Sequence, residues 1–94
     1  MPDYHEKDPQ AKLDYRWDWT TWLAQGETIT AADVDVTPAG LTIADDPAVA
    51  HDAHTVTAWL EGGELYTDYV VTCHMTTSQG RTDDRGKRIR VTDR

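Results

Sequence analysis

The sequence predicts an all-β protein: an immunoglobulin-like antiparallel β-sandwich of about seven strands, with a flexible N-terminal arm. Three observations predict this fold. Several short segments alternate apolar and polar residues, which is typical of strands with one buried face. Turn-forming residues separate these segments at intervals of ~8–12 residues. No long helical periodicity is present, and 94 residues fit a single domain.

The arm is predicted in residues 1–12, and the sandwich domain in residues 13–94. The first twelve residues contain two prolines and many charges, and they offer little to bury. Two interpretations stay open: a loose chain end, or an arm that orders only against a partner, with Tyr4 as its anchor. The segment also lacks the apolar centre of a signal peptide.

The first predicted strand, residues 13–19, has a heavily aromatic inner face. Leu13, Tyr15, Trp17 and Trp19 alternate with charged residues. Paired tryptophans also occur in carbohydrate-binding platforms, but a core position is favoured in so small a domain without phenylalanine. One helical turn is expected after this strand, ending at a glycine.

The remaining strands follow from alternation and turn residues. A phase shift at Ala31-Ala32 suggests a β-bulge. The strand over residues 54–60 places Trp59 on its outer face, and the final hairpin begins after Gly62-Gly63. The expected strands are residues 27–36, 41–43, 54–60, 66–77 and 87–92, with a weak strand or loop at 45–50 and turn residues at 78–86.

One shared core is predicted from residues in the same phase of these strands. Its expected members are Tyr15, Trp17, Trp19, Val56, Leu60, Tyr69, Val71, Ile89 and Val91.

Charge excludes some classes of partner. The net charge of -8 argues against nucleic acid, which requires a basic footprint. No segment has the ~20 apolar residues of a membrane span. Six of the nine basic residues lie in the last fourteen positions. They solvate the outer face of an edge strand, or they form a basic stripe that docks on an acidic partner.

No catalytic, cofactor or metal site is predicted. The single Cys73 excludes an internal disulfide and is expected to be a buried thiol. His51, Asp52 and His54 are expected in a solvated loop rather than around a metal. Asp83-Asp84 are expected in the hairpin turn. No nucleophile set or phosphate-binding loop is present, so the protein is not expected to be an enzyme.

Two motifs carry a resemblance to a known family. The run LDYRWDWTTWLAQGETI and the run YVVTCHMTTSQGRTDDR, followed by RIRV, are similar to phage fiber-tail adaptor proteins. The similarity covers roughly residues 8–92. It departs from the family pattern at His74 and Met75, and at Gly86-Lys87. The resemblance implies an immunoglobulin-like virion protein without catalytic residues.

The resulting hypothesis is a non-enzymatic virion module that binds tail, fibre or major capsid proteins in multiple copies per particle. It would be located in the virion, and in the host cytoplasm during assembly. Tail adaptor and capsid decoration protein both stay open. A carbohydrate-binding module that uses Trp59 or the Trp17–Trp19 pair is the alternative. The predicted partner-binding residues are Tyr4, Trp59, Arg88 and Arg90.

Overall fold

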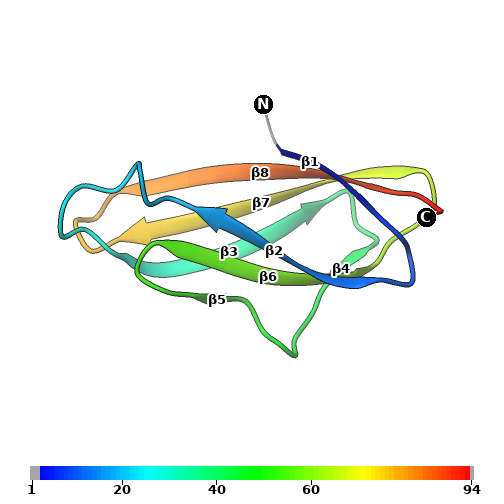
Figure 1. The fold of residues 1–94 in the computed structure, drawn as a ribbon, viewed down its shortest axis with the longest axis horizontal. Helices are drawn as coiled ribbons and strands as arrows, with labels where there is room; N and C mark the ends of the chain where they lie inside the picture. Colours follow the sequence, from blue (N-terminus) through cyan, green and yellow to red (C-terminus); the bar gives the residue numbers. More distant parts are fainter. Residues whose placement is uncertain (1–2, 94) are drawn as a thin grey trace.

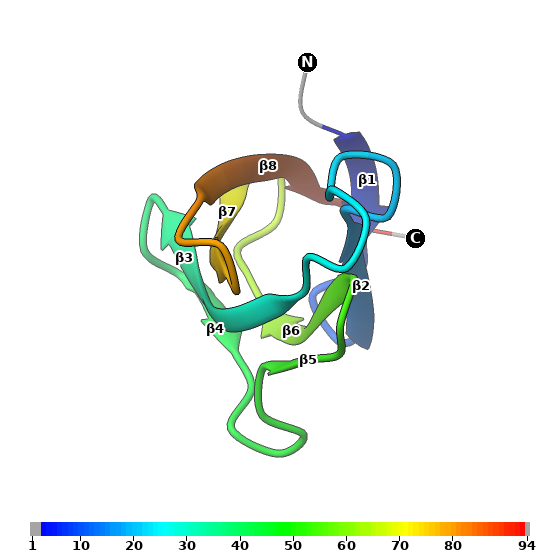
Figure 2. The same cartoon turned by 90° about the vertical axis from the view of Figure 1, so that its left-hand side faces the viewer.

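The computed structural model describes residues 3–93, which form two β-sheets packed face to face (Figures 1 and 2). The strands are β1 (Asp3–Lys7), β2 (Lys12–Asp18), β3 (Ile29–Thr37), β4 (Leu41–Ile43), β5 (Ala50–His51), β6 (Thr55–Gly62), β7 (Thr67–Thr77) and β8 (Thr82–Val91). One sheet has the order β1-β8-β7-β3. The other has the order β2-β6-β4, and β5 also pairs with β6. The prediction of an all-β sandwich is confirmed.

The core lies between the two sheets, where the alternating apolar residues of both layers meet. All nine residues predicted to form it are buried in one cluster. Ile29, Val34, Leu41, Cys73 and Met75 belong to the same cluster. Leu13 is the exception on the aromatic face of β2, because its side chain stays 41% exposed. The period-two pattern therefore placed the interior correctly, except at the start of β2.

The bulge and the hairpin turn differ in detail from expectation. The register of β3 against β7 shifts between Ile29 and Ala31, one or two residues before the predicted position. β8 begins at Thr82 rather than Lys87, so the hairpin turn covers only residues 78–81. Turn-forming residue types after the turn are held in strand conformation by tertiary contacts, which a local propensity cannot express.

The N-terminal segment also differs from expectation. Residues 3–7 form β1, which pairs in parallel with β8, and residues 1–2 lie outside the described part of the chain. The Lys7 ammonium group is buried and donates to the carbonyls of Asp8 (2.9 Å) and Gly62 (2.8 Å). Burial lowers the pKa of Lys7. Residues 3–7 therefore form part of the sandwich in this structure, where the buried Lys7 ammonium group has two carbonyl acceptors. The flexibility of the arm in the free protein stays a prediction.

Two features favour an immunoglobulin-like topology, which stays a prediction. The orders β3-β7-β8 and β2-β6-β4 correspond to the C-F-G and B-E-D orders of immunoglobulin domains. In addition, the Tyr69 hydroxyl near the start of β7 accepts a hydrogen bond from the backbone N–H of Glu64 (3.0 Å). This contact resembles the tyrosine corner of such domains.

Candidate protein-binding surface

The pairing of β1 with β8 brings an exposed tyrosine beside a distant arginine. Tyr4 is the Cα partner of Arg88, which is in turn the partner of Val70 in β7. Tyr4 is 53% exposed and Val70 is 40% exposed. The Arg88 guanidinium lies 5.9 Å from the centroid of the Tyr4 ring. An aromatic, a cationic and an aliphatic group thus lie in one row across three strands.

A single carboxylate holds both arginines of this surface. Asp68 accepts hydrogen bonds from Arg88 (3.0 Å) and from Arg90 (3.2 Å). These bonds, that from Arg88 being the stronger, lower the pKa of Asp68. The two guanidinium groups are thereby held in place on the surface. We call the surface formed by Tyr4, Asp68, Val70, Arg88 and Arg90 the arginine face.

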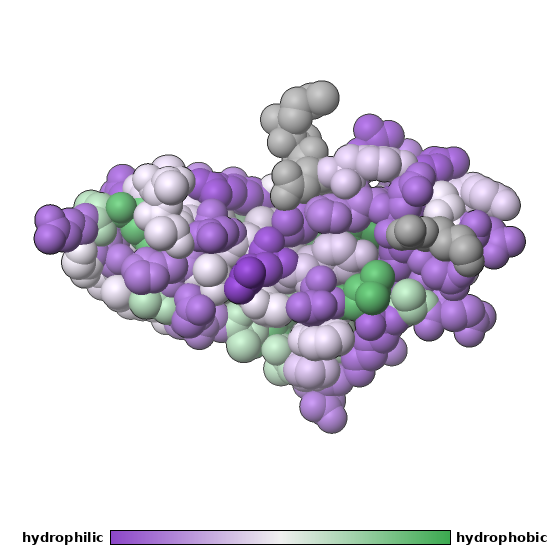
Figure 3. Space-filling model, viewed as in Figure 1, coloured by the Kyte–Doolittle hydropathy of each residue, from purple (hydrophilic) through white to green (hydrophobic). Residues whose placement is uncertain are grey.

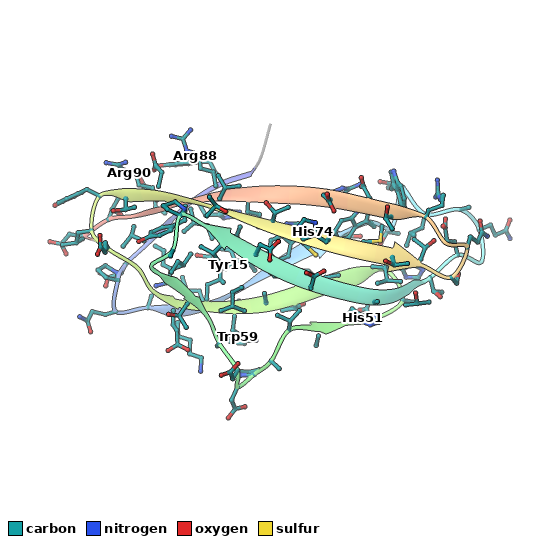
Figure 4. All side chains as sticks on the ribbon, turned by 180° about the vertical axis from the view of Figure 1, so that it is seen from behind. Tyr15, His51, Trp59, His74, Arg88 and Arg90 are labelled. Carbon is teal, nitrogen blue, oxygen red and sulfur yellow. The ribbon has the colours of Figure 1, made fainter. Side chains whose placement is uncertain are left out.

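The structure does not place Trp59 on the arginine face. Trp59 is half-buried in β6 of the other sheet, where its Cα partner is Asp14. Figure 4 shows Arg88 and Arg90 on one side of the sandwich and Trp59 on the opposite side. Of the four residues predicted to bind a partner, three therefore come together. A contact between Trp59 and a partner would need a second surface.

Three other basic residues, in the turn between β7 and β8 and in the first half of β8, cover tryptophan rings. Each lies within cation–π distance of its ring. The pairs are Arg81–Trp22 at 4.0 Å, Arg85–Trp19 at 4.9 Å and Lys87–Trp17 at 5.3 Å. Lys87 is buried, so it does not belong to a solvated or docking stripe, whereas the side chains of Arg81 and Arg85 stay 45% and 38% exposed. For these two arginines both interpretations stay predictions. Because Trp17 and Trp19 are buried, they cannot form the exposed platform of a carbohydrate-binding module.

The turn between β7 and β8 is tied to the loop before β3 by a buried carboxylate. Glu27 is 1% exposed, and its two oxygens accept bonds from Nε (2.9 Å) and Nη2 (2.6 Å) of Arg81. The Thr77 hydroxyl and the Ala24 backbone N–H also donate to this carboxylate. The Arg81 bonds, followed by those from Thr77 and Ala24, lower the pKa of Glu27 to about 2.

A second set of contacts surrounds Trp19 at the same end. Its indole N–H donates to Asp83 (2.8 Å), and Arg85 donates to the backbone carbonyl of Asp18 (2.8 Å). Asp83 and Asp84 were expected in the hairpin turn, but both lie within β8. The carboxylate of Asp83 satisfies a buried indole, which explains why a turn-forming residue is found in a strand.

A histidine on the outer face bridges three strands. His74 in β7 lies 2.7 Å from a carboxylate oxygen of Asp35 in β3 and 2.6 Å from one of Asp84 in β8. The hydrogen bonds to Asp84 and Asp35 raise the pKa of His74. Asp33, its Cα partner in β3, adds a third carboxylate to this region. When the imidazole is protonated, its positive charge offsets repulsion among these acids.

The comparison with family models now decides the identity of the chain. The model described as podophage GP4 fiber-tail adaptor protein gp77 matches residues 7–90. The chain belongs to this family. No curated protein matches the chain. The resemblance inferred from the two sequence motifs is confirmed.

In this fiber-tail adaptor family member, the two motifs meet at one end of the sandwich (Figure 2). Trp19 and Glu27 come from the first motif, and their partners Asp83, Arg85 and Arg81 come from the second. The two motifs therefore occur together for a structural reason, because the second motif supplies the hydrogen-bonding partners of the buried Trp19 and Glu27 side chains in the first. These charged residues stabilise the fold and are not part of the arginine face.

The other candidate groups of this family member have structural partners. Burial raises the pKa of the Cys73 thiol to about 12. Asp52 accepts bonds from the backbone N–H groups of His54 (2.8 Å) and Thr55 (2.7 Å), which makes it a turn residue. Within residues 3–93, no group of three His, Cys, Asp or Glu side chains is arranged to hold a metal ion. The described chain also contains no helix with the length and hydrophobicity of a membrane span.

Sequence reasoning missed Val70 and Asp68 as parts of the surface. Both lie in the outward phase of β7, which the alternation around Tyr69 and Val71 already indicated. Their position opposite Arg88 and Arg90 depends on the hairpin register. The sequence predicted a longer turn, which gives a different register. The sequence therefore predicted the face of β7 on which Asp68 and Val70 lie, but not the register that pairs them with Arg90 and Arg88.

Proposed function

We propose that this chain is a non-enzymatic virion adaptor that binds other virion proteins through its arginine face. Membership of a fiber-tail adaptor family supports a tail or fibre protein as the partner, rather than the major capsid protein. We also propose that multiple copies assemble in each particle, after the chain folds in the host cytoplasm. A virion reconstruction would test this placement, and density on the capsid shell would contradict it.

The observation that carries the proposal is the β1–β8 pairing, which places Tyr4 beside Arg88 and Val70. Tyrosine and arginine are enriched in protein interfaces and at their energetic hot spots. The bonds to Asp68 reduce the side-chain entropy that Arg88 and Arg90 would lose on binding. Because Asp68 offsets one of the two positive charges, we expect recognition to depend on shape and planar stacking as well as on charge.

The double variant Arg88→Glu/Arg90→Glu tests this surface. Loss of hot-spot contacts of about 2 kcal/mol would weaken partner binding at least tenfold. We expect quantitative mass spectrometry of purified particles to find far fewer copies of the variant. Its circular dichroism spectrum should match the wild type, since exposed ion pairs contribute about 1 kcal/mol or less each.

The matched control is Lys12→Glu/Arg16→Glu on the outer face of β2. It makes the same change in net charge at exposed positions of the other sheet. We expect normal incorporation of this control. Equal loss of both variants would show that net charge, rather than the arginine face, controls assembly. Normal incorporation of the Arg88/Arg90 variant would place the docking surface elsewhere.

A further inference from the structure

A groove lies on the side of the sandwich where each sheet ends in a terminal strand. β1 ends one sheet and β2 ends the other, and the loop over residues 8–11 joins them. The groove between them has a volume of about 500 Å³ and is lined by Tyr4, His5, Glu6, Leu13, Asp14 and Tyr15. This side faces the viewer in Figures 1 and 3, and Figure 3 shows hydrophobic groups on it surrounded by hydrophilic ones.

The groove lining combines apolar side chains with negative charge. Tyr4 and Leu13 are among the large hydrophobic residues that remain exposed, at 53% and 41%. Apart from His5, the charged lining residues are the acids Glu6 and Asp14. The net charge of the chain is also strongly negative, at -8. The acids that line the groove and the net charge of the chain favour a basic ligand, whereas Arg88 and Arg90 lie opposite Tyr4 and Glu6 on the neighbouring strand.

The backbone at the groove is suited to binding an extended chain. Among the described residues, β1 pairs only with β8, and β2 pairs only with β6. A terminal strand presents backbone N–H and C=O groups to which another strand can add. The groove is also continuous with the arginine face, because Tyr4 belongs to both.

We propose that an extended segment of a partner virion protein, with alternating basic and apolar residues, adds to the edge of β1. Its basic side chains lie on the face of β1 that carries Tyr4 and Glu6, and its apolar side chains lie on the opposite face, toward Leu13. Asp14 adds to the negative charge that attracts the basic side chains. This proposal rests on the proposed adaptor function and names the chemistry of the partner. A second copy of this chain is disfavoured as the occupant, because a symmetric contact would bring the acidic grooves of two negatively charged chains together.

Titration of the full ¹⁵N-labelled chain with model peptides tests the proposal without any virion component. The probe is the blocked peptide Thr-Lys-Val-Arg-Val-Lys-Thr. One control replaces its three basic residues with glutamate, and a second replaces both valines with proline. We expect the NMR signals of backbone amides to shift over residues 4–7 and 13–15. Both control peptides should bind at least tenfold more weakly. The first lacks the basic charges, and the second lacks backbone N–H groups that pair with a neighbouring strand.

Three results would overturn the proposal. The first is a set of shifts centred on the acidic region around His74, and the second is equal binding of the proline peptide. The third is concentration-dependent dimerisation of the chain through β1, measured by analytical ultracentrifugation.

A pair of charge variants gives the matched comparison. Asp14→Lys and Asp33→Lys make the same change in net charge on exposed positions of different strands. We expect Asp14→Lys to weaken binding of the basic peptide about tenfold and Asp33→Lys to change it less than twofold. Equal weakening would indicate general electrostatic attraction and overturn the groove assignment. A failed titration together with loss of the Arg88/Arg90 variant from particles would reject the groove and retain the adaptor function.

Discussion

Large side chains are buried at one end of the sandwich and exposed at the other. At one end, Trp19 is buried, and the Glu27–Arg81 pair and Asp83 bind groups from the facing loop. Backbone bonds such as that from Ser78 to Thr28 (2.8 Å) add to these contacts. We call this end, residues 19–28 and 76–85, the clamped end.

The other end exposes its large side chains. The loop between β6 and β7 leaves Leu65 46% and Tyr66 65% exposed, and Tyr4, Leu13 and Val70 lie in the adjoining half of the strands. Tyr66 also has a positive φ of 59°, which is uncommon for an aromatic residue. The charged residues of the family motifs therefore stabilise one end of the fold, whereas exposed apolar side chains mark the surface that is available to partners.

The largest expected effect is at the clamped end. Trp19→Ala removes a fully buried indole, its hydrogen bond to Asp83 and its cation–π contact with Arg85. We expect a loss of about 3–5 kcal/mol, against a total of roughly 5–15 kcal/mol for small domains. Thermal unfolding checks this. Tyr66→Ala is the control at the exposed end, and it should change stability by about 0.5 kcal/mol or less. Equal melting temperatures for both variants would contradict the larger contribution of the clamped end to stability.

Acid titration sharpens the role of Glu27. Its pKa is about 2 in the folded state, below the ordinary value of 4.5. The ionised carboxylate therefore stabilises the fold above pH 4.5, and this contribution is lost as the pH falls from 4.5 toward 2. We expect Glu27→Gln to be less stable at neutral pH and to lose less stability over that range. A variant with the wild-type slope of melting temperature against pH would show that other acids dominate.

Hydrogen exchange tests whether β1 belongs to the sandwich in the free protein. Because Lys7 is buried and the strand pairs with β8, we expect slow exchange at the amides that bond to β8. The residues of the β6–β7 loop should exchange quickly. Rapid exchange of β1 in the free protein, followed by protection in the particle, would instead support an arm that orders on assembly.

The smallest expected effect concerns His74. Its pKa is raised above the ordinary 6.5 by Asp84 and Asp35, so its contribution is fully present below pH 6.5 and is lost as the pH rises through the raised value. Asp33 is the Cα partner of His74 in β3. Because the His74 side chain is partly exposed, we expect the melting temperature to decrease only slightly as the pH rises through the raised pKa. A flat profile, with an unshifted NMR titration of His74, would contradict this coupling.

The strand faces, and therefore the core, could be predicted from the sequence alone. Alternation around Tyr15, Val56, Tyr69 and Ile89 depends only on the geometry of the strand, in which successive side chains point to opposite faces. The family motifs were also recognisable without coordinates. The outward positions of Arg88 and Arg90 followed from the same alternation.

Which of these faces meet depends on contacts between residues that are distant in the sequence. The pairing of β1 with β8 required acceptors for Lys7 that lie far away in the sequence, at Gly62. The start of β8 at Thr82 required the indole of Trp19 as a partner for Asp83. Local propensities describe a residue in isolation, whereas the free energy of a buried polar group depends on the partner that the fold brings to it. The arginine face could therefore be predicted in part, but its separation from Trp59 could not.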